Sequence, residues 1–314
     1  MRIERLAREN GRTQGATRRA WYRAQNPAHL TSVAALVEEA LAARSSDVAS
    51  AAVALGAGAC TELPLGRIAA TCARVTLVDL DAPGMAEARD ELPSEAQSRV
   101  ELLAGDLTGG VSASLAAELR AQPWGDLAAL DPSGRAALDA AASCLERCAV
   151  PDPPEMVGLE PRGYGLVVSD LTLTQLFSLP LLDLLDALNV HAPRATDLRE
   201  GYARYVAAAR DFRRRVAHAH LSLIDGLLAT GGAGLLLTDV TGFLLAPKTG
   251  PHARERREAL AVLPREVLAL PDDLAARFAI VGEPRRWRWL VTQPTAETPG
   301  RAYDAVGLVF RRRG

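Results

Sequence analysis

The chain has 314 residues, of which 48% are hydrophobic and 24% charged, and its formal net charge is -2 at pH 7. This length is ample for one large domain or two small ones with a buried core. The near-zero net charge disfavours a protein that mainly binds nucleic acid or an anionic membrane, because such proteins carry a basic excess. We therefore expect a small-molecule substrate, with a homodimer as one possible assembly.

No apolar stretch reaches the roughly 20 residues that a membrane-spanning helix needs. One of the longest covers residues 181–188, and Asp183 and Asp186 interrupt it. The first 19 residues hold six arginines and no apolar run, which is not the pattern of a secretory signal peptide. The sequence therefore predicts no membrane association and a cytoplasmic location.

Short apolar runs alternate with helical patterns along most of the chain. Residues 33–41 have helical periodicity, with Thr31 and Ser32 as the expected N-terminal cap. The strand-like runs that follow are residues 52–55, 75–78, 100–103, 165–168 and 234–237. Near-continuous apolar strands that alternate with helices predict a parallel sheet with helices on both faces, that is, a doubly wound α/β fold.

Two segments depart from this alternation. Nearly 60 residues separate Asp106 from the fourth run, and they show helical patterns at 111–119 and 136–148. We expect a helical insertion at about 107–162 that covers the site. The last two strand-like runs, 287–292 and 303–311, are too close for a crossover helix, so they should form an antiparallel C-terminal hairpin.

The first strand leads directly into a glycine-rich turn. Gly56 and Gly58 allow the backbone to approach a ligand closely, and the helix that follows presents free N–H donors. A dinucleotide fingerprint would place a third glycine at position 61, where this chain has Thr61. The turn also lacks the Gly-Lys-Ser/Thr of a phosphate-binding loop, so it predicts a polar ligand other than a pyrophosphate.

Carboxylates end the next two strands. Asp79 lies 21 residues after Gly58, where a carboxylate can accept hydrogen bonds from both hydroxyls of a ribose. Asp106 ends the third strand, where it either meets an adenine amino group or caps its own loop. Together, the turn and the two carboxylates predict a site for adenosine.

In order and spacing, these segments resemble the class I S-adenosylmethionine-dependent methyltransferases. The resemblance covers roughly residues 20–312 and is carried by ALGAGACTELPL, VTLVDLDAPGMAEAR, ELLAGDL and YGLVVSDLTLTQL. It implies a Rossmann-like, mostly parallel, seven-stranded sheet in a catalytic domain over 51–314, preceded by a helical lid over 1–50. The expected cofactor-binding residues are Trp21, Gly56, Ala57, Gly58, Asp79, Leu80, Gly105, Asp106, Leu107 and Ser169.

Three side chains are expected at the reaction centre. By the resemblance, Asp170 borders the sulfonium of S-adenosylmethionine at the end of the fourth strand. Tyr22, next to Trp21, lies where the family often folds a lid, and an aromatic ring that faces a sulfonium stabilises the cation. Tyr205 is placed to close the substrate side. For each aromatic residue, packing into the core is the alternative role.

Other polar residues refine this site. Where the family usually has an acidic residue and a third glycine, this chain has Ala54 and Cys60, so Glu62, Asp170 or an N-terminal arginine is expected to hold the amino acid end of the cofactor. The cysteines form no Cys-x-x-Cys pair and the histidines no i, i+4 pair, so no metal is expected.

Several functions are compatible with such a site. The first is methyl transfer from S-adenosylmethionine to a small-molecule acceptor of the natural-product type. The alternative is cyclisation or lysis of S-adenosylmethionine itself, which gives azetidine-2-carboxylate or a related four-carbon amino acid and methylthioadenosine. The remaining hypotheses are a non-catalytic binding protein and a nicotinamide-dependent oxidoreductase. The chain lacks an Asn/Asp-Pro-Pro-Tyr signature, so a nucleic-acid base is not the expected acceptor.

Overall fold

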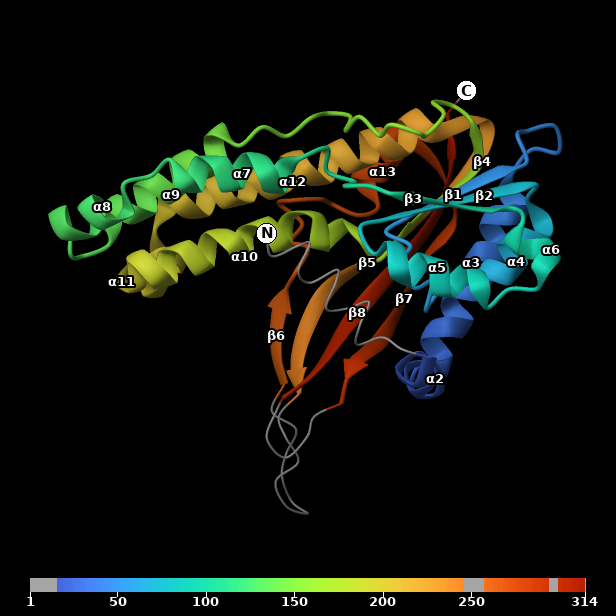
Figure 1. Ribbon diagram of the computed structural model, residues 1–314, viewed down its shortest axis with the longest axis horizontal. Helices are drawn as coiled ribbons and strands as arrows, with labels where there is room; N and C mark the ends of the chain where they lie inside the picture. The colour runs from blue at the N-terminus through green and yellow to red at the C-terminus, as the bar shows by residue number, and fades with distance from the viewer. Residues whose placement is uncertain (1–15, 246–256, 294–298, 314) are drawn as a thin grey trace, which may run out of the picture.

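The computed structural model describes residues 16–245, 257–293 and 299–313. Within these residues, an eight-stranded sheet has the order β3-β2-β1-β4-β5-β8-β7, and β6 pairs with β5. Helices cover both faces of the sheet (Figure 1). The predicted Rossmann-like, doubly wound α/β architecture is confirmed.

The strands are β1 (Ala51–Leu55), β2 (Arg74–Asp79), β3 (Val100–Ala104), β4 (Tyr164–Asp170), β5 (Leu228–Leu245), β6 (Arg257–Ala261), β7 (Phe278–Thr292) and β8 (Gly300–Arg312). The α-helices are α2 (Ala16–Gln25), α3 (Pro27–Ala43), α4 (Leu65–Thr71), α5 (Ala82–Asp90), α6 (Ser94–Gln97), α7 (Val111–Arg120), α8 (Trp124–Leu130), α9 (Arg135–Arg147), α10 (Leu173–His191), α11 (Pro193–Leu198), α12 (Ala203–Leu227) and α13 (Asp272–Arg277).

The five predicted central strands pair in parallel, and β8 lies antiparallel between β5 and β7. The expected antiparallel hairpin is therefore present. The expected count of seven strands is too low, because β6 adds an antiparallel partner to the second half of β5. In Figure 1 the second half of β5 extends with β6, β7 and β8 beyond the ends of the central strands.

The N-terminal helix α3 begins earlier than the sequence pattern predicts. It starts at Pro27, whose fixed φ suits the first helical turn. The expected caps, Thr31 and Ser32, lie inside the helix, and their hydroxyls donate at 2.8 Å to the carbonyls of Pro27 and Ala28. Inside a helix, a Ser or Thr hydroxyl donates to the carbonyl four residues earlier and therefore caps no free N–H group.

The sheet separates two apolar cores. One core contains buried residues of α3, α4 and α5, and the other contains buried residues of α7, α9, α10 and α12. Figure 1 shows α7, α9, α10 and α12 side by side in one elongated layer. The helices of the expected insertion therefore pack against α10 and α12. All four cysteines are buried and free.

Helix α10 is the one helix in the described ranges that is long and apolar enough to cross a membrane by length and composition. Seven of its 19 residues are buried, including Phe177, Leu184 and Leu188, in the same apolar core as residues of α7 and α12. These contacts are those of a core helix.

Candidate functional site

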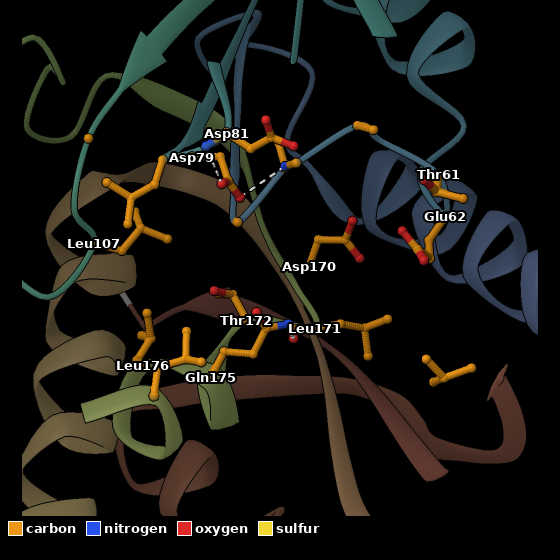
Figure 2. Close-up of a pocket in the computed structure, with 18 of the residues that line it drawn as sticks. Thr61, Glu62, Asp79, Asp81, Leu107, Asp170, Leu171, Thr172, Gln175 and Leu176 are labelled. Carbon is orange, nitrogen blue, oxygen red and sulfur yellow. Dashed lines mark hydrogen bonds between the residues drawn. The ribbon is translucent and has the colours of Figure 1, made fainter. Parts of the chain in front are cut away.

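A cavity of about 370 Å³ lies at the carboxyl ends of the central strands. This is the edge at which open α/β sheets bind ligands, and the size is within the range of small-molecule sites. Eleven of the thirteen residues predicted for the site line the cavity: Trp21, Tyr22, Gly56, Ala57, Gly58, Asp79, Leu80, Gly105, Asp106, Leu107 and Asp170. Figure 2 shows several of these side chains around the same space.

The glycine-rich turn after β1 is held close to two neighbouring elements. Gly56 has φ +75°, and a Cβ at this position would lie 2.4 Å from the Cβ of Thr172. The Gly58 N–H donates to Oδ2 of Asp79 at 3.0 Å, and the Asp81 N–H donates to Oδ1 of Asp79 at 2.8 Å (Figure 2). Asp79 therefore fixes the turn while its carboxylate also borders the cavity.

Asp106 has a structural role in its own loop. One of its oxygens accepts from the N–H of Thr108 at 2.9 Å and from the Thr108 hydroxyl at 2.7 Å. The other accepts from the N–H of Gly110 at 3.1 Å, immediately before α7. Of the two roles expected for Asp106, the structure therefore contains the loop cap.

The centre of the cavity is acidic. Asp170 ends β4 and is 5% exposed, and its Oδ1 has no hydrogen-bond partner in the described part of the chain. Burial, followed by the negative charges of Glu62 and Asp79, raises the pKa of Asp170 well above its usual value. Burial also raises the pKa of Glu62. Two carboxyl groups that share one cavity favour a cationic ligand.

An aromatic corner adjoins these carboxyl groups. The Tyr22 hydroxyl and the indole N–H of Trp289 are buried, and the hydroxyl lies between this indole and the Glu62 carboxyl, which both interact with it. Burial and the charge of Glu62 raise the pKa of Tyr22. His29 stacks on Trp289 with ring centroids 5.2 Å apart, and its Nδ1 accepts the indole N–H of Trp287 at 2.7 Å. The aromatic rings are thus positioned by α3 and β7 together.

Helix α2 is attached to the body of the protein on two sides. Arg19 forms ion pairs with Glu87 and Glu91 of the segment around α5. The Asn26 side chain donates to the carbonyl of Leu290 at 2.9 Å and accepts its N–H at 3.1 Å. These contacts hold Trp21 and Tyr22 at the cavity, which is the position expected for the N-terminal lid.

Two predicted site residues lie elsewhere. Ser169 does not line the cavity, because successive strand residues point to opposite faces and its neighbour Asp170 occupies the cavity face. The Ser169 hydroxyl instead lies 2.8 Å from Nε2 of His220 on α12. Tyr205 is 7% exposed within the core that contains α9 and α12, so the expectation that it closes the substrate side is wrong.

The expected insertion at about 107–162 does not cover the cavity. Of its residues, only Leu107 and Thr108 line the cavity, and none of α7, α8 and α9 does.

The buried His220 should make the stability of the protein depend on pH. Burial lowers its pKa from 6.5 to about 4, so between these values the unfolded chain binds a proton that the folded protein does not. As the pH is lowered from 7 to 4, the free energy of unfolding should therefore decrease, and His220 should account for about 3 kcal/mol of the decrease. Denaturant unfolding of wild type and His220→Gln should show a shallower loss in the variant. If the free energy of unfolding changed equally with pH in both proteins, the lowered pKa of His220 would be contradicted.

Several lining residues were not predicted. The start of α10 contributes Thr172, Gln175, Leu176 and Leu179, and β7 contributes Val291 together with Trp289. Leu171, between β4 and α10, has φ +50°, which is uncommon for a residue with a side chain. The apolar members of this set give the acidic cavity one apolar wall.

No protein-family model matches the chain, and no curated protein does. Several solved structures are similar over most of its length. A structure described as a DhpI–SAH complex has 14% identity and a TM-score of 0.37, covering 97% of this chain and 94% of the other. An S-adenosylmethionine-dependent methyltransferase from Aquifex aeolicus has 11% identity and a TM-score of 0.33, covering 88% and 86%.

A third similar structure is a chain from the complex between the Haloferax volcanii Trm112 methyltransferase activator and a methyltransferase. It has 12% identity and a TM-score of 0.38, covering 94% of this chain and 96% of the other. At these low sequence identities and TM-scores, the similarities assign no function to this chain. The function depends on the residues that line the cavity.

Proposed function

We propose that this chain binds S-adenosylmethionine in the cavity and transfers its methyl group to a small-molecule acceptor. The observation that carries the proposal is the position of two carboxylates in one cavity. Asp79 borders the glycine-rich turn, and Asp170, at the end of a strand next to β1, has a buried Oδ1 with no hydrogen-bond partner among the described residues. This pair matches a ligand with a ribose at one end and a cation further along.

The remaining lining residues support the fit. Leu107 and Leu176 offer apolar surface to an adenine ring next to the ribose position. The ammonium group of the amino acid would bind Glu62, which leaves Asp170 to face the sulfonium. Its carboxylate would accept from the Tyr22 hydroxyl and the Trp289 indole, two buried donors at the cavity. Glu62, Tyr22 and Trp289 would thus take the place of the acidic residue and the third glycine that the chain lacks at Ala54 and Cys60.

Catalysis in this proposal is mainly positioning. S-adenosylmethionine supplies an electrophilic methyl group: the acceptor lone pair forms the new bond to carbon while the electron pair of the C–S bond returns to sulfur. The chain contributes alignment and exclusion of water. Leu179 and Val291 belong to the apolar wall of the cavity and Trp21 also lines the cavity, which favours an acceptor with an apolar body. Trp21 is 41% exposed, as expected of a residue at the cavity mouth.

A second candidate is cyclisation of S-adenosylmethionine. The observation that favours it is the corner formed by Glu62, Tyr22 and Trp289. A carboxylate beside the ligand's ammonium group is placed to take its proton, and the nitrogen lone pair can then attack the γ-carbon. The C–S bond breaks and methylthioadenosine leaves. Aromatic faces stabilise the sulfonium until that point.

Incubation of the purified protein with S-adenosylmethionine alone, followed by mass spectrometry, separates these candidates. The proposal expects binding in calorimetry and an intact ligand. Formation of methylthioadenosine with a four-carbon amino acid, above the rate in protein-free solution, would establish the second candidate. Failure of S-adenosylmethionine to bind would overturn both.

A further inference from the structure

We propose that the carboxylate of Asp170 makes this cavity select cationic ligands, so that S-adenosylmethionine binds more tightly than its demethylated product S-adenosylhomocysteine. This inference rests on the proposed function and adds a specificity to the same site. The two ligands share the adenosine and amino acid parts. They differ in one methyl group and in the positive charge on sulfur.

The position of Asp170 is the first support. The residue is 5% exposed, and no described residue donates a hydrogen bond to its Oδ1. In Figure 2 its side chain lies between Asp79 and Glu62 at the cavity. A buried carboxyl oxygen without a hydrogen-bond partner has lost its hydration without compensation, so a cation that enters the cavity supplies the missing interaction.

The charge balance around Asp170 is the second support. Asp79 on β2 and Glu62 after β1 add negative charge from two other elements. Among the described residues that line the cavity, Arg19 is the only Lys or Arg, and Glu87 and Glu91 already bind its guanidinium.

Arg23, the other nearby cation, is 43% exposed and does not line the cavity. Its Nε donates to the carbonyl of Thr61 at 3.4 Å, and its guanidinium lies 3.7 Å from Glu91. The charge of Arg23 lowers the pKa of Glu62, but no cation of the described chain is among the groups that act on Asp170.

Charge selection of this kind has a consequence for turnover. Methyl transfer converts a sulfonium into a neutral thioether, so the attraction that holds the donor is absent from the product. At the effective dielectric constant of a partly buried site, one unit charge several ångströms away changes affinity by roughly 10- to 100-fold. Product release is thus favoured by the same carboxylate that holds the donor.

Calorimetry with the full chain at pH 8, which favours the ionised carboxyl, tests the inference. The ligands are S-adenosylmethionine, S-adenosylhomocysteine and sinefungin, in which a protonated amine takes the place of the sulfonium and no methyl can be transferred. In wild type, both cations should bind roughly 10- to 100-fold more tightly than S-adenosylhomocysteine. In Asp170→Asn the preference should fall to within about twofold, mainly through weaker binding of the cations.

Asp126→Asn is the matched control, because it removes one carboxylate from the exposed surface of α8 and should keep the wild-type preference. Equal or tighter binding of S-adenosylhomocysteine by wild type would overturn the inference, and so would an equal loss for all three ligands in Asp170→Asn. If Asp170→Asn fails to fold, the order of the three affinities in wild type decides. Failure of every ligand to bind wild type would instead overturn the proposed function.

Discussion

Replacement of Gly56 by alanine should lower the free energy of unfolding by about 3 to 5 kcal/mol and abolish ligand binding. Two costs add at this position. The backbone has φ +75°, which disfavours any residue with a Cβ, and the new Cβ would lie 2.4 Å from the Cβ of Thr172. Relief requires a shift of the turn or of the start of α10, and both line the cavity. Denaturant unfolding and calorimetry would measure the two effects.

Gly110→Ala provides the control for this prediction. Gly110 also has positive φ, at +101°, but a Cβ there would meet nothing within 4 Å. It should therefore incur the backbone cost alone, about 1 kcal/mol, and keep ligand binding. Equal destabilisation by the two substitutions would show that Thr172 moves aside freely.

The second large effect is expected for Asp79→Ala. This change removes the acceptor of the N–H groups of Gly58 and Asp81 as well as the expected partner of the ribose hydroxyls. Binding of S-adenosylhomocysteine should weaken by roughly 1.5 to 3 kcal/mol, or about 10- to 150-fold.

Calorimetry on Asp79→Ala and on Asp90→Asn, an exposed charge removal on α5, provides the comparison. Asp90→Asn should bind as wild type does. Unchanged affinity in Asp79→Ala would remove the ribose assignment and with it the orientation of the ligand.

The central sheet could be predicted from the sequence because a parallel strand covered on both faces is a continuous apolar run. β1, β2 and β4 are buried along most of their length, whereas β3 is an edge strand that is only partly buried. The second half of β5 and all of β6 lie beyond the other central strands, where no such run is required, so their pairing depends on partners distant in sequence. The early start of α3 at Pro27 was missed because Thr31 and Ser32 carry a cap pattern that the helix does not use.

The site divides in the same way. Gly56, Asp79, Asp106 and Asp170 were predictable, because each lies at or within two residues of the end of a strand and parallel strand ends meet at one sheet edge. Ser169 was assigned to the wrong face, since the face of a fully buried strand that borders the cavity is fixed by tertiary structure.

The residues that the sequence missed, or misplaced, come from elements whose position no local pattern specifies. Trp289 reaches the cavity from a strand more than 100 residues after β4. Tyr205 has helical spacing that is equally compatible with a core and a site position. Thr172, only two residues after Asp170, could have been inferred from its place at the end of β4.

The hydrogen bonds of Asn26 also bear on the free edge of the sheet. β7 is the last strand of its sheet, and an unpaired edge strand is a template for another chain. The Asn26 amide offers Leu290 one donor and one acceptor, just as a neighbouring strand would. A single side chain thus blocks sheet extension at this point of the edge, and the same residue ties the end of α2 to β7.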